Sequence, residues 1–389
     1  MTPVRRAGPR VDAGATPERS AGARIDALVV GAGPAGLATS RELSRRGVSH
    51  RVLEKGDVVG HVWANLYDSL TLHTGRHMSH LPGRRFQAGT PLFPPRAVFV
   101  EYLHEYARAF RVPVETNVEV TRLARDGGEW VAATTAGDIR ARTVVLTTGI
   151  VSNPRRPALP GIDVYRGALM HSSAYHRPAA FAGQRVLVIG VGNSGGEIAS
   201  ELARHGAHVT VAVRSGANVV PREIAGVPVQ YLSFLLRKLP RAAQQRVAAW
   251  VQRMGERRRG PPVLPRPAHS ALDAIPLIGF NLVDAIREGL VAVRPGIERV
   301  TEHGVRFTDG RQEPFDTIIA ATGFRAAVQP LGDLVKLDDR GFGSRTDRVV
   351  SADQPNLFYV GHNYDSTGGL MNIARDAPLA AAQVVKALQ

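Results

Sequence analysis

The sequence predicts an α/β protein with two Rossmann-like dinucleotide-binding domains, each with a small antiparallel meander. The first observation behind this prediction is the run IDALVVGAGPAG, in which an apolar strand leads into Gly31-x-Gly33-x-x-Gly36 before a helical pattern. The first glycine of such a motif allows a tight turn, the second lets the backbone approach a pyrophosphate, and the third lets the helix pack closely on the strand. The N–H groups at the start of the helix favour a phosphate. We name residues 31–36 the first cradle.

A second copy of this arrangement indicates an internal duplication. The apolar segment RVLVIG is followed by Gly190-x-Gly192-x-x-Gly195 and then by the helical pattern GEIASELARHG. We name residues 190–195 the second cradle. Strand, glycine motif and helix in this order are more specific than a glycine-rich turn alone.

The residue that ends the next strand distinguishes the two cradles. Glu54 stands eighteen positions after Gly36, where an acid would bind a ribose hydroxyl. Arg214 stands nineteen positions after Gly195, and a cation there favours the 2′-phosphate of NADPH over NADH. The alternative for Arg214 is a solvated charge at a strand end in an arginine-rich chain.

Short strands of alternating polarity follow each cradle. Residues 117–123, 129–135 and 138–146 predict a meander that ends at Thr148-Gly149, and residues 291–307 with 316–321 predict a second that ends at Thr322-Gly323. A last strand over 357–361 precedes a last helix, whose N-terminus would stabilise negative charge on a bound cofactor. We expect a disordered leader over 1–24, one domain over 25–155 and 326–389, and the other over 156–325.

Composition narrows the function. The 389-residue chain has no cysteine, which excludes disulfides, zinc–thiolate sites and the CxxC chemistry of disulfide reductases. We expect no metal site and a reducing, cytoplasmic compartment. The net charge is +15, but 45 of the 49 basic residues are arginines spread along the chain, which favours anionic cofactors and acidic substrates over nucleic acid. The sequence contains no run of 18 apolar residues and predicts no membrane span.

Two further segments have more than one interpretation. Residues 231–239 and 241–254 carry apolar side chains at helical spacing on either side of Pro240. They indicate a cap over a site or a helical hairpin packed on the domain surface, and docking to a membrane surface is a third alternative. The irregular stretch 55–82, with Trp63 and His73, indicates either the lining of a site or an ordinary packed loop.

A motif between the cradles adds a family resemblance. Tyr165-x-Gly167-x-x-x-His171-x-x-x-Tyr175 resembles the fingerprint of class B flavin-dependent monooxygenases, F-x-G-x-x-x-H-x-x-x-(Y/F). Its ending in Tyr175 is similar to the N- or S-oxygenating and YUCCA branch rather than the Baeyer–Villiger branch. The segments YDSLTLH, VGNSGGEIA, VRSGANVVPRE and DTIIAATGF look like YUCCA segments in the same order. Plant YUCCA enzymes convert indole-3-pyruvate to indole-3-acetate by oxidative decarboxylation, although a fold does not define its substrate.

The resemblance implies FAD and NADPH as cofactors, with O2 and a small organic molecule as substrates. NADPH would reduce FAD, O2 would add to the reduced ring as a flavin 4a-(hydro)peroxide, and the protein would exclude water. FAD contacts are expected from Gly31, Gly33, Pro34, Ala35, Gly36 and Glu54, with Lys55, Trp63 and His73 as additions. NADPH contacts are expected from Gly190, Gly192, Asn193, Ser194, Gly195 and Arg214. Further cofactor contacts are expected from Gly149, Ser172, Thr322, Gly323, Gly361, Gly369 and Leu370.

Two side chains are assigned to the reaction itself. The resemblance places His171 beside the nicotinamide half, the alternative being a hydrogen-bonded structural histidine, and places Asn65 near the reactive face. Neither a nucleophile nor an acid–base dyad is expected. Oxidative decarboxylation of a 2-oxo acid, N- or S-oxygenation of an amine or sulfide, and an NADPH oxidase or electron-transfer reductase all stay open. The chain departs from the family pattern at Gly60-His61 and over residues 361–369.

Overall fold

The computed structural model describes residues 24–389 except 237, 269–274, 364 and 366. The expected leader therefore lies outside the described residues apart from Arg24. That residue is the first of strand β1 (Arg24–Val30), so the expectation of disorder is wrong for Arg24.

The first sheet has seven strands in the order β3-β2-β1-β6-β5-β4, with β19 also paired to β6. Its parallel part contains β1, β2 (His50–Leu53), β3 (Val114–Glu115), β6 (Ile139–Leu146) and β19 (Leu357–Tyr359). Strands β4 (Val120–Asp126) and β5 (Glu129–Thr134) pair antiparallel with each other, and β5 pairs antiparallel with β6. The first predicted meander is thus β4–β5–β6, and β19 returns from the end of the chain to the edge of β6 that also pairs with β5.

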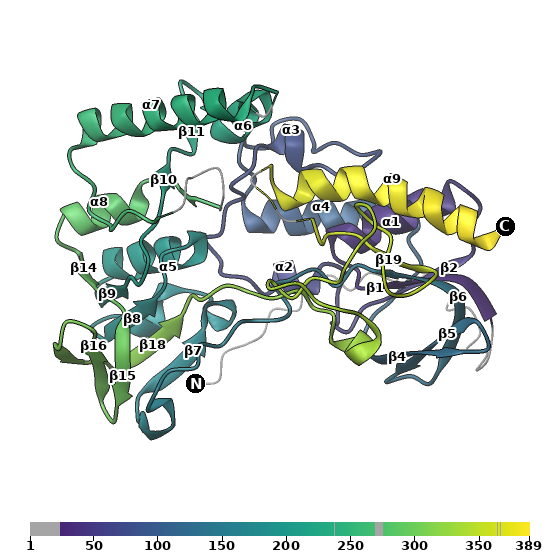
Figure 1. The fold of residues 1–389 in the computed structure, drawn as a ribbon, viewed down its shortest axis with the longest axis horizontal. Helices are drawn as coiled ribbons and strands as arrows, with labels where there is room; N and C mark the ends of the chain where they lie inside the picture. Colours follow the sequence, from purple (N-terminus) through teal and green to yellow (C-terminus); the bar gives the residue numbers. More distant parts are fainter. Residues whose placement is uncertain (1–23, 237, 269–274, 364, 366) are drawn as a thin grey trace.

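Three helices cover one face of this sheet: α1 (Pro34–Ser44), α4 (Arg96–Ala109) and α9 (Gly369–Leu388). Figure 1 shows α9 lying along α1 and above the strands. Leu37, Phe99 and Ala377 join these helices in one buried cluster. The opposite face packs on the 3-10 segment η4 (Gln329–Leu334) through residues that include Leu331 and Trp130. Apolar periodicity predicts a helix over 99–110, and the helix begins three residues earlier.

The second sheet has five parallel strands in the order β14-β9-β8-β18-β7. These are β7 (Ala168–His171), β8 (Arg185–Ile189), β9 (His208–Ala212), β14 (Val291–Arg294) and β18 (Thr317–Ala320). Helices α5 (Asn193–Arg204) and α8 (Asn281–Arg287) accompany them. The predicted fold class, two Rossmann-type units in a mixed α/β protein, is confirmed.

The second meander is shorter than predicted. Strands β15 (Ile297–Thr301), β16 (Gly304–Phe307) and β17 (Gln312–Pro314) form a separate antiparallel sheet. The expected first strand of that meander, β14, instead pairs in parallel with β9. The short apolar run of residues 291–293 did not distinguish an edge strand of the parallel sheet from a meander strand.

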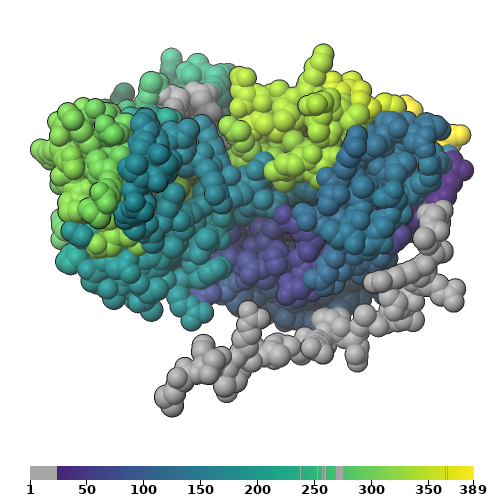
Figure 2. Space-filling view, turned by 90° about the horizontal axis from the view of Figure 1, so that it is seen from below, coloured from purple at the N-terminus to yellow at the C-terminus, as the bar shows by residue number. Residues whose placement is uncertain are grey.

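The remaining elements are the other helices, the two-residue strands and the 3-10 turns. Short helices α2 (His61–Ala64) and α3 (Arg76–Ser79) come from the first half. Helices α6 (Val229–Leu236) and α7 (Arg241–Arg259) follow the two-residue strands β10 (Val219–Val220), β11 (Glu223–Ile224) and β12 (Val227–Pro228), and β13 (Leu277–Ile278) pairs with β10. Three-residue and four-residue 3-10 turns occur at η1 (Ile162–Val164), η2 (Ser172–Ala174) and η3 (Pro178–Phe181). Figure 2 shows the purple and blue residues of the first half meeting the teal residues of the second half along one seam.

Candidate functional site

The first cradle is a close-packed turn that only glycine permits. Gly31 has a φ of 104°, and a Cβ on Gly36 would stand 1.9 Å from the carbonyl oxygen of Gly31. A Cβ on Gly33 would meet nothing within 4 Å, and Gly33 lines a cavity. The turn therefore brings α1 directly against β1 and leaves the backbone at Gly33 open to a ligand, which is the shape that a pyrophosphate requires.

Glu54 is fixed beside the first cradle. It follows β2, its side chain is buried, and its two carboxylate oxygens accept the N–H groups of Ala32 at 2.8 Å and Gly56 at 2.9 Å. Glu54 also lines the cavity. Since a carboxylate has about four acceptor positions, it retains capacity for the ribose hydroxyl that the sequence assigns to it.

The second cradle repeats this geometry. Gly190 has a φ of 99°, and a Cβ on Gly195 would stand 2.1 Å from the carbonyl oxygen of Gly190. Asn193, at the start of α5, accepts the N–H of Ile278 at 2.8 Å, and it lines the cavity together with Ser194. The sequence duplication is thus a structural one, with a helix N-terminus facing a cavity in each copy.

One continuous cavity of about 1740 Å³ joins the two cradles. Its walls include the first cradle, the segment 60–74, the start of α5, the cap helices α6 and α7, and the start of α9. Among the expected cofactor contacts, the cavity is lined by Gly31, Gly33, Pro34, Ala35, Glu54, Lys55, Trp63, His73, Gly149, Ser172, Asn193, Ser194, Gly361, Gly369 and Leu370. Helices α6 and α7 therefore cover a cavity instead of packing on a plain domain surface.

Other expected contacts lie outside this lining. Gly36 and Gly195 are buried, Gly190 is half-buried and Gly192 is exposed, and Arg214 is exposed beyond the end of β9. A Cβ on Gly296 would lie 3.7 Å from the Cγ of Arg214, so the stem of the arginine passes this glycine. The exposure of Arg214 agrees with the solvated-charge alternative and leaves its guanidinium accessible.

His171 is engaged within the protein. Its Nδ1 accepts the N–H of Ser173 at 3.1 Å, which leaves Nε2 to donate to the carbonyl oxygen of Gly323 at 3.1 Å. The ring lies edge-on to Phe324 with centroids 5.1 Å apart, and burial lowers the pKa of His171. A neutral imidazole whose two nitrogens are both hydrogen-bonded matches the alternative of a structural histidine. The next residue, Ser172, lines the cavity.

Asn65 and Thr322 also point elsewhere. Asn65 is exposed at the end of α2, where its Nδ2 donates to the carbonyl oxygen of His61 at 2.8 Å, and it does not line the cavity. The Thr322 hydroxyl donates to the carbonyl oxygen of Arg155. The arrangement of Asn65 does not favour a direct role at the reactive face, and the hydroxyl of Thr322, an expected cofactor contact, is engaged within the protein.

A polar cluster that sequence reasoning missed connects the second cradle to the first half. Glu197, on α5, accepts hydrogen bonds from the Tyr67 hydroxyl and from Arg222 at 3.1 Å, and its Oε1 lies 3.6 Å from Nε2 of His73. Burial raises the pKa of Tyr67 well above its usual value and lowers that of His73, so both are neutral. An acid in GGEIA was the available signal, but an acid on a helix normally indicates a solvated face.

His73 carries the one unusual atom of this cluster. Its Nδ1 is buried and has no hydrogen-bond partner among the described residues, although His73 lines the cavity. With Nε2 directed at a carboxylate, the proton lies on Nε2 and Nδ1 is an acceptor. A buried acceptor without a partner costs free energy, so Nδ1 of His73 lowers the stability of this cluster.

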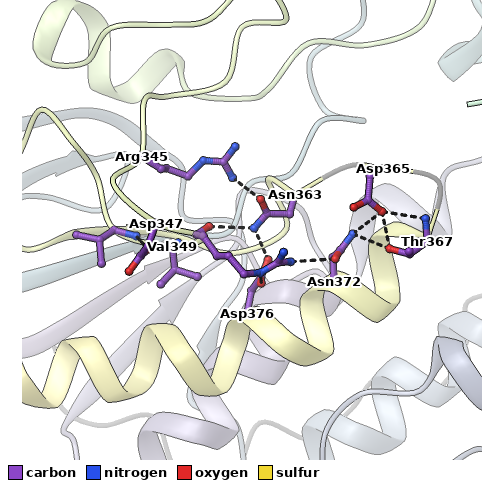
Figure 3. A network of polar contacts seen from close by, with 10 residues as sticks. Arg345, Asp347, Val349, Asn363, Asp365, Thr367, Asn372 and Asp376 are labelled. Carbon is purple, nitrogen blue, oxygen red and sulfur yellow. Dashed lines mark hydrogen bonds and ion pairs between the residues drawn. The ribbon is translucent and has the colours of Figure 1, made fainter. Parts of the chain in front are cut away.

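The start of α9 is held by a second polar network, shown in Figure 3. Asp376, fully buried on α9, accepts from Nε of Arg348 at 2.7 Å and from Nδ2 of Asn363. Arg348 also donates to Asn372 at 2.9 Å, and Asn372 donates to Asp365 at 3.1 Å. These contacts fix the segment in which Gly361, Asp365 and Gly369 line the cavity.

Comparison with known proteins identifies the family. The indole-3-pyruvate monooxygenase YUCCA1 of Oryza sativa subsp. japonica is 36% identical over 313 residues, which is 78% of this chain and 77% of its own length. The probable indole-3-pyruvate monooxygenase YUCCA1 of Arabidopsis thaliana is 34% identical over 77% of this chain and 76% of its own length. This chain belongs to the YUCCA-type flavin monooxygenases. The expected family and enzyme class are confirmed.

The YUCCA-type chain also resembles solved flavin monooxygenases. The flavin-containing monooxygenase from Stenotrophomonas maltophilia matches with a TM-score of 0.75 and 25% identity, over 93% of this chain and 98% of its own. Cyclohexanone monooxygenase from Rhodococcus sp. Phi1 bound to NADP+ matches with a TM-score of 0.72 and 21% identity over 94% and 84%, and shares the fold. The pyridine nucleotide-disulphide oxidoreductase profile matches residues 28–225. Within the described residues, no helix is long and apolar enough to cross a membrane.

Proposed function

We propose that this YUCCA-type monooxygenase binds FAD at the first cradle and NADPH at the second, and oxygenates a 2-oxo acid such as indole-3-pyruvate by oxidative decarboxylation. The observation that supports this best is the continuous cavity lined by both cradles. A flavin and a nicotinamide placed in it could meet, and both relatives above carry indole-3-pyruvate in their names.

The residues at each cradle fit a dinucleotide. Gly33 and Gly192 leave space where a Cβ would meet nothing within 4 Å, which suits the close approach of a pyrophosphate. Glu54 suits the ribose of FAD, and the exposed guanidinium of Arg214 suits a 2′-phosphate reached from outside the cavity wall. The proposed FAD-binding domain covers 25–155 and 326–389, and the proposed NADPH-binding domain covers 156–325.

Bound FAD would supply the oxygen chemistry, and NADPH would supply the electrons. The chain itself would position the cofactors and shield the reaction from water. The N-terminus of α9, beside Gly369, would stabilise negative charge on the ring. Neutral His73 lines the cavity and would contact a cofactor or substrate bound there. Helices α6 and α7 cover the cavity and reduce the access of water, which protects a reactive oxygen species from decay.

His171 acts in this proposal as a positioning residue. It holds the carbonyl of Gly323 on one side and the turn at Ser173 on the other, and so places Ser172 in the cavity wall. The absence of cysteine suits a cytoplasmic enzyme. Its proposed partners are O2 and small molecules.

Product analysis tests this proposal. The purified holoenzyme is supplied with NADPH, O2 and indole-3-pyruvate, and NADPH consumption, CO2, H2O2 and product mass are measured together. We expect CO2 and indole-3-acetate in proportion to NADPH. An oxygenated amine or sulfide in a parallel panel, without CO2 from any 2-oxo acid, would instead support N- or S-oxygenation. Consumption of NADPH matched only by H2O2 would contradict a monooxygenase.

A further inference from the structure

Helix α7 presents a basic face with one aromatic side chain. The helix contains six arginines and a single acid. Arg246, Trp250, Arg253 and Arg257 recur at intervals of four, three and four residues, which places them on one side of an α-helix. All four are exposed, Trp250 by 60%. Trp250 therefore stands among three exposed cations on this face of α7.

Exposed apolar side chains surround this face. Five of the twelve exposed large apolar residues in the described chain fall between positions 224 and 250, including Ile224, Leu235, Leu239 and Trp250. These four also line the large cavity, so they form its rim where it reaches the surface. Figure 1 shows β11, α6 and α7 together along one edge of the molecule.

We propose that this edge, formed by β11, α6 and α7, docks on the surface of an anionic lipid membrane. A helix with arginines and a tryptophan beside exposed aliphatic side chains has the composition of an interfacial helix, in which cations meet head groups and apolar side chains enter the acyl boundary. The net charge of +15 adds long-range attraction to a negative surface.

A lipid surface matches the observations better than a nucleic acid does. Phosphates alone would bind the arginines, but they would leave Leu235 and Leu239 in water, exposed by 59% and 44%. A bilayer covers both kinds of side chain at once. The docked edge would also bring the mouth of the cavity to the membrane interface, from which apolar substrates could enter.

The test uses the full-length holoenzyme with phosphatidylcholine vesicles that contain either no anionic lipid or 30% phosphatidylglycerol, on the order of the anionic content of natural membranes. Of the three tryptophans, Trp130 is buried, Trp63 is half-buried and Trp250 is exposed. Insertion of Trp250 should therefore shift the emission to shorter wavelength with anionic vesicles, and Trp250→Phe should abolish that shift. Co-sedimentation gives the partition coefficient.

A charge-matched pair of variants isolates the surface. Arg246→Gln/Arg253→Gln/Arg257→Gln should lower the partition coefficient about a hundredfold, because each basic residue near an anionic surface contributes about fivefold. Arg299→Gln/Arg306→Gln/Arg311→Gln, on the exposed side of the β15–β17 sheet, removes equal charge elsewhere and should change it about threefold at most. Retained FAD absorbance and NADPH consumption show that the triple variants are folded.

Three results would overturn the proposal. Anionic vesicles could fail to bind the wild-type protein, both triple variants could lose binding equally, or the emission of Trp250 could stay unchanged in the sedimented complex. Tighter binding to a single-stranded oligonucleotide than to vesicles, lost in the α7 variant alone, would assign the surface to nucleic acid instead.

Discussion

Gly195→Ala should weaken NADPH binding selectively. The new Cβ would stand 2.1 Å from the carbonyl oxygen of Gly190, whereas Cβ contacts below 3.0 Å essentially do not occur. Helix α5 would therefore have to move about 1 Å away from the turn at Gly190, and overpacking of this kind costs about 1–3 kcal/mol. If that cost falls on the bound form, the Kd for NADPH rises about 5- to 150-fold.

Two measurements report the weaker binding of NADPH: titration of the flavin spectrum with NADP+, and the steady-state KM for NADPH. Gly36→Ala is the counterpart, since its Cβ would stand 1.9 Å from the Gly31 carbonyl oxygen, and it should weaken FAD retention instead. Gly255→Ala, on α7, makes the same chemical change with nothing within 4 Å and should leave both cofactors unaffected. A Gly195→Ala variant that binds NADPH within twofold of wild type, or that loses FAD as Gly36→Ala does, would contradict a steric effect confined to the second cradle.

Three further results are expected. Glu197→Ala leaves Tyr67 and Arg222 without their acceptor and should lower the free energy of unfolding by about 1–2 kcal/mol in urea denaturation, with Glu197→Gln closer to wild type. Asp376→Ala should lower the free energy of unfolding by about 3 kcal/mol and accelerate FAD release on dilution, because Arg348 loses its buried partner; an unchanged release rate would separate the network from the cofactor site. Burial lowers the pKa of His362 to about 3 from 6.5, so below pH 6.5 the unfolded chain binds a proton that the folded protein does not. The free energy of unfolding should then fall by up to about 1.4 kcal/mol per pH unit between pH 6.5 and 4, and His362→Leu should flatten that slope.

The local parts of this structure were predictable from the sequence. Each cradle is a short run in which strand, turn and helix follow one another, and a Cβ on Gly36 or Gly195 would meet the carbonyl oxygen of the first glycine of the same cradle. Such steric requirements leave a signature at fixed spacing. The fold class and the family followed from these runs and the segment 165–175.

The contacts between distant segments were not predictable. The pairing of β14 with β9 depends on an edge that the chain reaches only after 80 residues, and Glu197 meets Tyr67 across 130 positions. Asn65 stays a prediction, and its exposure shows that a polar residue in a segment that lines a cavity can still point to solvent. Apolar periodicity shows which side of a helix or strand is buried, but it does not show which other element covers that side.

The return of β19 and α9 to the first sheet has a consequence for biosynthesis. Strand β19 and helix α9 occupy the last 33 residues and complete the unit that begins at residue 24. While the ribosome makes the intervening residues, one edge of β6 and the flank of α1 stay uncovered, with apolar residues such as Leu37 open to other chains. The first unit can therefore mature only after the second has emerged, and nascent chains stalled before residue 357 should depend on chaperones and lack flavin.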